Sequence, residues 1–215
     1  MKILFLFLYG TLTRAYNLCV IGSTSGLGKE LVYQSTVERN MSVLALSGTS
    51  KPLTIPCREN SFEQINSQPI FNNPNVKKDN YWKSLKDYEY ENIVFTTSAK
   101  PFKEDYSDRL LVKILADLPK SCKHLILISA YGVGDSLNEN ELGINVMNKW
   151  YLKDVYRSKN NQENILDLDI FKTKYPELKK TILRPKALSY GKTFLPSIPR
   201  QELAKDILDK IDLQT

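Results

Sequence analysis

The chain has 215 residues, of which 42% are hydrophobic, enough for one full core with little left for a second domain. Its 30 Lys and Arg and 24 Asp and Glu give a formal net charge of +6, but the two signs are interleaved along the chain, which argues against nucleic-acid binding. The three cysteines, Cys19, Cys57 and Cys122, form no CxxC pair, so we expect neither a disulfide framework nor a metal site.

The chain begins with one lysine and a short apolar run at 3–9, followed by small and polar residues. Thr13 and Ala15 stand where a signal peptidase could cut after position 15. The run is too short to cross a bilayer, which takes about 20 residues, so no transmembrane segment is expected. We therefore expect 1–16 to be a signal or organelle-targeting segment, or else an extension of a cytoplasmic protein, and 17–215 to form the domain.

Apolar runs and amphipathic stretches alternate over the rest of the chain. The patterns predict strands at 18–21, 42–46, 92–97, 124–129 and 180–184, with a further candidate at 69–72 in a turn-rich region. They predict helices at 27–39, around 81–88, around 110–118, at 141–168 and at 200–211. Apolar strands separated by amphipathic helices are typical of a parallel sheet covered on both faces. We expect an α/β fold with a single Rossmann-like, doubly wound parallel sheet, whose ligand binds beyond the carboxyl ends of the strands.

A glycine-rich segment, VIGSTSGLGKE at 20–30, covers the end of the first strand and the start of the first helix. A Walker A loop would need glycine at 23 and Ser or Thr at 30, but the chain has Ser23 and Glu30, which excludes a P-loop nucleoside triphosphatase. The G-x-x-x-G-x-G spacing instead suits a dinucleotide loop, whose glycines allow a tight turn, close approach to the pyrophosphate and close helix packing. The alternative is a tight turn that binds nothing. We assign to cofactor binding the whole loop: Gly22, Ser23, Thr24, Ser25, Gly26, Leu27 and Gly28.

The choice of cofactor depends on the end of the second strand. An NAD site usually has an Asp or Glu there, about 20 residues past the glycines, to bind the ribose 2′-hydroxyl. No acid occurs between Asn40 and Arg58, and the segment SGTSK instead offers hydroxyls and the cation Lys51. These groups suit a 2′-phosphate, so we expect NADP, with NAD as the alternative. Ser47, Lys51 and Ser98, which follows the strand at 92–97, complete the predicted cofactor contacts.

The loop GSTSGLG after an apolar strand resembles the short-chain dehydrogenase/reductase superfamily. HLILISAYGVGDS resembles the fifth strand and active-site loop of that family, and KTILRP with IPRQELAKDILDKI resembles the end of its atypical, NmrA-like members. The resemblance covers about 17–212. It implies that Ser129 orients a substrate carbonyl, that a tyrosine donates a proton, and that a lysine four residues later binds the nicotinamide ribose.

The chain departs from that pattern at the tyrosine, because no tyrosine has a lysine four places on. Lys159 stands where the lysine is expected, but Val155 takes the place of the tyrosine and Tyr156 comes one residue late. One residue turns a helix by about 100°, so Tyr156 and Lys159 cannot form the usual pair on a regular helix. Ser129, Tyr156 and Lys159 are the candidate catalytic residues, with Lys159 also a cofactor contact.

Three functions fit this sequence. The first is an NADPH-dependent reductase of a small conjugated acceptor, working without the tyrosine as atypical relatives do, because such hydride transfer needs orientation more than an acid. The second is an inactive nucleotide sensor or an accessory subunit of a larger protein complex. The third is a carbonyl reductase in which Tyr156 or Tyr131 replaces the missing tyrosine.

A possible ion pair, a histidine and a turn remain to be interpreted. Lys159 and Glu163 have the i, i+4 spacing of a helix-surface ion pair. His124 is the only histidine, and we expect it at the surface, since one histidine cannot build a zinc site. The turn at 131–136 is expected to border the substrate pocket, because it follows the carboxyl end of a strand.

Overall fold

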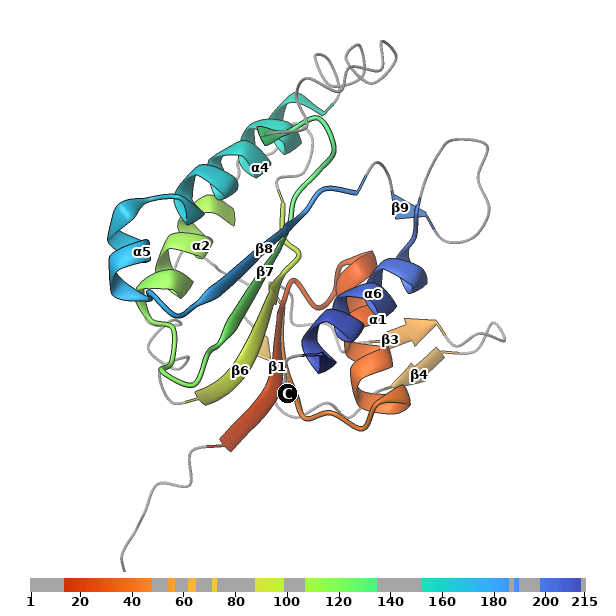
Figure 1. Ribbon diagram of the computed structural model, residues 1–215. Helices are drawn as coiled ribbons and strands as arrows, with labels where there is room; N and C mark the ends of the chain where they lie inside the picture. Colours follow the sequence, from red (N-terminus) through yellow and green to blue (C-terminus); the bar gives the residue numbers. More distant parts are fainter. Residues whose placement is uncertain are drawn as a thin grey trace, which may run out of the picture.

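Six parallel strands form the central sheet, in the order β5-β2-β1-β6-β7-β8 (Figure 1). In that order the strands are Phe71–Asn72, Val43–Ser47, Arg14–Ile21, Tyr88–Phe95, His124–Ile128 and Lys179–Leu183. The computed structural model describes residues 14–47, 54–56, 62–64, 71–72, 88–98, 107–134, 152–185, 188–189 and 198–213.

The chain reverses its direction of travel across the sheet at β1. After β1 it runs outward through β2 to β5, and then returns to place β6 on the other side of β1. A crevice opens outside the carboxyl ends of strands at such a switch point, and ligands of open α/β sheets bind there. The segments that follow β1 and β6 are therefore the first place to look for a site.

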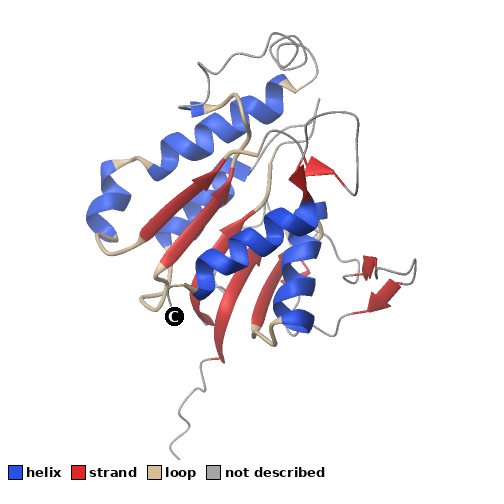
Figure 2. Cartoon of the chain, turned by 45° about the vertical axis from the view of Figure 1, so that its right-hand side comes forward, coloured by secondary structure: helices blue, strands red, loops and turns tan. Residues whose placement is uncertain are grey.

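Helices cover both faces of the sheet (Figures 1 and 2). On one face lie α1 (Gly26–Tyr33), which continues into the π-helix η1 (Gln34–Glu38), and α6 (Arg200–Asp212). On the other lie α2 (Ser107–Ala116), α4 (Lys153–Leu166) and α5 (Asp169–Lys174). None of the helices in these described stretches is long and apolar enough to cross a membrane.

The period-two alternation of strand side chains divides the core between the two faces. In β1, Cys19 and Ile21 belong to the cluster under α2, α4 and α5, whereas Leu18 and Val20 belong to the cluster under α1 and α6. Because successive side chains point to opposite faces and both faces are covered, the strands read as continuous apolar runs.

The fold prediction is confirmed: the sheet is parallel, doubly wound and covered on both faces. The strand at 69–72 is confirmed in part as β5. The strand β1 begins at Arg14, before the expected start at 17, so a cut after Ala15 would fall inside it. The structure places Tyr88 in β6, so the expected helix at 81–88 is wrong at its last residue.

Several expectations concern residues that lie outside the described part of the chain, namely 1–13, most of the 81–88 helix, and 141–151 of the long helix. Two small sheets were not predicted, because they lie in turn-rich segments. One pairs β3 (Thr54–Pro56) antiparallel with β4 (Phe62–Gln64), and the other pairs β9 (Leu188–Ser189) parallel with β10 (Ile198–Pro199).

Candidate functional site

The glycine loop begins with a backbone conformation that favours glycine. Gly22 has φ +86°, and its N–H donates to Leu46 O at 2.9 Å, at the end of β2. A Cβ on this residue would lie 2.6 Å from Thr96 Oγ1 and 2.8 Å from Thr97 Cγ2. The missing side chain therefore lets the segment after β6 approach the end of β1 closely.

The first helix starts with a side-chain cap. Ser25 Oγ accepts a hydrogen bond from Gly28 N at 3.0 Å, which satisfies one of the amide groups that a helix start leaves open. A Cβ on Gly28 would lie 2.2 Å from Gly22 O, so glycine is required for the helix to pack against the loop. This third glycine thus has the close-packing role that the spacing predicts.

The other hydroxyls of the loop tie it to neighbouring strands. Ser23 is fully buried, and its Oγ donates to Leu46 O at 3.0 Å. Thr96 Oγ1 donates to Ile21 O at 2.7 Å and lies 3.1 Å from Ser25 Oγ. The amino terminus of α1 is consequently held at the switch point, and its first turn has no acidic residue. Amide groups and the helix dipole make such a terminus suitable for a phosphate.

The carboxyl ends of β6 and β7 hold two buried hydroxyls. Thr97 Oγ1 and Ser129 Oγ are shielded from solvent, and the structure gives them no hydrogen-bond partner in the part of the chain that it describes. Ser129 is 5% exposed, and its backbone N–H donates to Leu183 O at 2.8 Å. Sequence reasoning assigned Ser129 to the site but missed Thr97, because a threonine after a strand belongs to no motif.

Lys159 is buried beneath the same edge of the sheet, although lysine is rarely found there. Its Nζ donates to Thr97 O and Ile128 O, both at 2.6 Å, and to Gln162 Oε1 at 3.1 Å. An ammonium group has three N–H donors, so these contacts give each of them an acceptor on the protein. The lysine, which comes from α4, thus joins the carboxyl ends of β6 and β7.

A polar network fills the interface of α2 with α4 beside Lys159. Gln162 is fully buried, and its Nε2 donates to Ser107 Oγ at 2.7 Å. Ser107 Oγ lies 2.8 Å from Ser158 Oγ, across the two helices. Buried polar groups that are all paired fix one arrangement of their elements. The network thus holds α4, and with it Lys159, in register with the sheet.

The surface-pair interpretation of Lys159 and Glu163 is wrong, because both side chains are buried. Glu163 is 4% exposed and accepts a bidentate pair of hydrogen bonds from Arg184, at 3.0 Å from Nε and 2.8 Å from Nη2. Gly134, with φ +57°, packs on this pair so closely that a Cβ would lie 2.1 Å from Glu163 Oε2. The pair therefore packs against the loop after β7; whether this loop borders a substrate pocket stays a prediction.

The remaining predicted site residues are less defined. Tyr156 is half-buried on α4, which is a regular helix, so it does not share the face of Lys159 in the i, i+4 manner. Ser98 is exposed, and Ser47 is the last residue of β2. Lys51 and the side chain of Ser47 lie outside the described residues. Thr24, Gly26 and Leu27 lie in or next to the start of α1.

His124 is fully buried at the start of β7, so the expectation of a surface histidine is wrong. Its Nε2 lies 2.8 Å from Thr181 Oγ1 on β8. Burial, with a smaller contribution from the charge of Lys179, lowers the pKa of His124 from 6.5 to about 4. The histidine lies at the amino ends of the strands, far along the sheet from the glycine loop.

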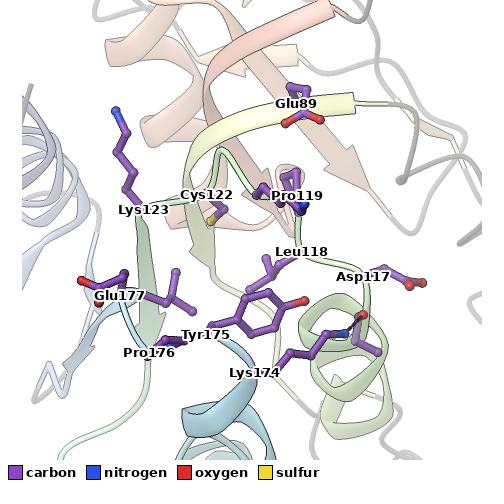
Figure 3. Close-up of a pocket in the computed structure, with 13 residues that line it drawn as sticks. Glu89, Asp117, Leu118, Pro119, Cys122, Lys123, Lys174, Tyr175, Pro176 and Glu177 are labelled. Atoms are coloured by element: carbon purple, nitrogen blue, oxygen red, sulfur yellow. Dashed lines mark hydrogen bonds between the residues drawn. The ribbon is translucent and has the colours of Figure 1, made fainter.

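A groove of about 760 Å³ also lies at the amino ends of the strands (Figure 3). Lys123, Tyr175 and Leu178 are among its lining residues, which include both acidic and basic side chains. Burial raises the pKa of the Cys122 thiol in its wall to about 12, so this cysteine is not a reactive thiolate. The groove therefore lies at the opposite ends of the strands from the glycine loop.

No protein-family model and no curated protein matches the chain. Solved structures do match it. ChuY, an anaerobilin reductase from Escherichia coli O157:H7, has a TM-score of 0.59 and 13% identity, with 91% of this chain and 89% of that chain covered. A short-chain dehydrogenase from Burkholderia cenocepacia J2315, in complex with NADP, has a TM-score of 0.52 and 12% identity over 93% and 85% of the two chains.

The enzyme WbmH of Bordetella bronchiseptica, in complex with NAD+, has a TM-score of 0.60 and 11% identity, with 93% of this chain and 73% of that chain covered. Identities this low establish the fold alone. The chain therefore has a Rossmann-like fold, as these solved structures do.

Proposed function

We propose that the chain is an NAD(P)-binding protein of the short-chain dehydrogenase/reductase type, with the atypical, NmrA-like form of that fold. One observation carries the proposal: a capped helix start without acids in its first turn, held by Gly22 and Gly28 at the switch point of a doubly wound sheet. A pyrophosphate suits this position. The residues present thus fit a dinucleotide.

The same proposal makes NADP the preferred cofactor. Ser47 ends β2, the strand next to β1, where an NAD site would have its acidic residue. The chain has no acid between Asn40 and Arg58, and a 2′-phosphate would face hydroxyls and Lys51 instead of a carboxylate. Solved structures of the same fold hold NADP in one case and NAD+ in another, so the fold itself is compatible with either cofactor.

For activity we favour an NADPH-dependent reductase of a small conjugated acceptor that works without a protein acid. The cofactor would supply a hydride, and the chain would orient the two reactants. Lys159 directs its ammonium group to protein oxygens. One helical turn before it, Val155 occupies the position where the family pattern has a tyrosine. A tyrosine and lysine acting together are therefore not part of this proposal. The reductases of similar fold support it at the level of architecture.

The contacts of Lys159 also favour a second candidate, an inactive dinucleotide sensor or a subunit of a larger complex. A lysine engaged by Thr97 O and Ile128 O serves the structure whether or not hydride transfer follows. Both candidates predict dinucleotide binding, and only the first predicts turnover.

The test is a titration of the purified full chain with NADPH and with NADH, followed by reduced-nicotinamide fluorescence. Flavin, biliverdin and quinone acceptors are then added to the NADPH complex. We expect tighter binding of NADPH and acceptor-dependent oxidation of it. Binding without turnover on any acceptor would favour the sensor or subunit, and absence of binding to either nucleotide would overturn the proposal.

A further inference from the structure

The hydroxyl groups along the carboxyl edge of the sheet fall into two kinds. Near the glycine loop, Ser23 Oγ donates to Leu46 O at 3.0 Å and Thr96 Oγ1 donates to Ile21 O at 2.7 Å. Farther along, Thr97 Oγ1 and Ser129 Oγ are buried and have no partner among the described residues. The first two hydroxyls hold neighbouring strands together, whereas the second two make no hydrogen bond within the part of the chain that the structure describes.

The two residues that carry the unpaired hydroxyls follow neighbouring strands of the sheet. The last register pair of β6 with β7 joins Phe95 to Leu127, and Thr97 and Ser129 each lie two residues farther along. Neighbouring strands of a sheet are about 4.8 Å apart. Lys159 Nζ lies 2.6 Å from both Thr97 O and Ile128 O, so one ammonium group holds together the two segments that carry the hydroxyls.

A buried hydroxyl without a partner is unfavourable, because the hydrogen bond to water lost on burial is not replaced. Native proteins retain few such groups, and those retained often belong to a site. Each hydroxyl can both donate and accept. Together they suit an uncharged ligand group that does the same, such as a ribose hydroxyl or a carboxamide.

We propose that Thr97 and Ser129 form a two-hydroxyl subsite for the nicotinamide riboside half of the dinucleotide. The inference rests on the proposed function. It assigns Ser129 to the cofactor, where the family resemblance assigns it to the acceptor. It also adds Thr97, whose methyl group is seated in the space that Gly22 leaves open, with Cγ2 2.8 Å from where a Cβ would be.

The test compares Thr97→Val and Ser129→Ala with two variants that serve as controls for the urea midpoint only, Thr96→Val and Ser23→Ala. Each change removes one hydroxyl at nearly constant shape. Three quantities are measured on the full chain: the dissociation constant of NADPH, that of 2′,5′-ADP, which lacks the nicotinamide half, and the urea midpoint of the ligand-free protein.

We expect the two test variants to lose about tenfold in NADPH affinity, as for one hydrogen bond, with unchanged affinity for 2′,5′-ADP. Their urea midpoints should equal or exceed the wild-type midpoint, because an unpaired buried hydroxyl has been removed. The controls should have lower midpoints, since Thr96 and Ser23 lose bonds that the fold uses. Thr97→Ser, which keeps the hydroxyl, should retain most of the NADPH affinity.

Unchanged NADPH affinity in both test variants would refute the subsite and leave the proposed function intact. Midpoints that fall as far as those of the controls would show that these hydroxyls are structural, and would also refute it. An equal loss of affinity for 2′,5′-ADP would do the same. A wild-type chain that binds 2′,5′-ADP and NADPH equally well would contradict the subsite alone, whereas one that binds neither would overturn the proposed function.

Discussion

Two glycines of the loop serve different purposes at the scale of single residues. Gly28→Ala would place a Cβ 2.2 Å from Gly22 O, a backbone atom that cannot move without opening the turn. We expect a loss of stability of about 1–3 kcal/mol, as for overpacking in a core, together with loss of NADPH binding. Gly26→Val changes the first residue of α1, beside the expected pyrophosphate. It should abolish binding at a much smaller cost in stability.

Urea unfolding and NADPH fluorescence distinguish the two effects. Lys29→Ala, a substitution on the same helix, is the control for an unspecific effect of changing α1. Wild-type affinity in Gly26→Val would contradict the pyrophosphate position, whatever the stability of the variant.

Ser47 offers a test of the proposed preference for NADP. Ser47→Asp would place a carboxylate at the end of β2, where it can accept hydrogen bonds from a ribose diol and repel a 2′-phosphate. We expect the preference for NADPH over NADH to fall by at least tenfold, and Ser47→Asn, of similar size without the charge, to change it less. The ratio of the two dissociation constants is the measurement. A wild-type chain that already prefers NADH would show that the missing acid was misinterpreted.

Among the elements, α4 carries the departure from the family pattern. Tyr156 precedes Lys159 by three residues on a regular helix, and the buried ammonium group already contacts three protein oxygens. If hydride transfer needs no protein acid, Tyr156→Phe should leave kcat within a few-fold, whereas loss of a general acid typically costs 10²-fold or more.

Val155→Tyr provides the reciprocal comparison, because it places a phenol one helical turn before Lys159. Both variants are assayed with NADPH and the best acceptor found, and with a simple ketone. A large loss of kcat in Tyr156→Phe would show that the tyrosine reaches the reacting atoms despite its register.

The elements were predictable where the periodicity is strong, as in α6, whose buried residues Leu203, Ile207 and Ile211 follow the helical repeat. They were not predictable where pairing depends on distant segments, as in the β3–β4 hairpin. The site divides in the same way. The glycine loop was predictable, because the spacing of its glycines reflects the backbone conformation and close packing of neighbouring residues. Arg184 and Glu163 are 21 residues apart and meet only through the sheet, so their ion pair was not.

At the scale of the whole molecule, His124 links stability to pH. It is fully buried between β6 and β8, pairing in register with Asn92 and Lys179. The sequence alone does not predict this burial, because burial at a strand end depends on what covers that end. Here the neighbouring strand supplies Thr181 as its hydrogen-bond partner at 2.8 Å.

The pKa of His124 is about 4 in the folded protein against 6.5 as its ordinary value. Between these values the unfolded chain binds a proton that the folded chain excludes, so the free energy of unfolding rises with pH across this window. The contribution of His124 to stability is fully present above about pH 6.5 and is lost progressively down to about pH 4, by up to roughly 3 kcal/mol.

The measurement is the urea unfolding free energy at several pH values. His124→Gln, which keeps an amide near Thr181 but cannot titrate, should be less stable at pH 7 and should flatten the slope between pH 4 and 6.5. An unchanged slope in this variant would assign the acid sensitivity to the carboxylates of the chain and not to the buried imidazole.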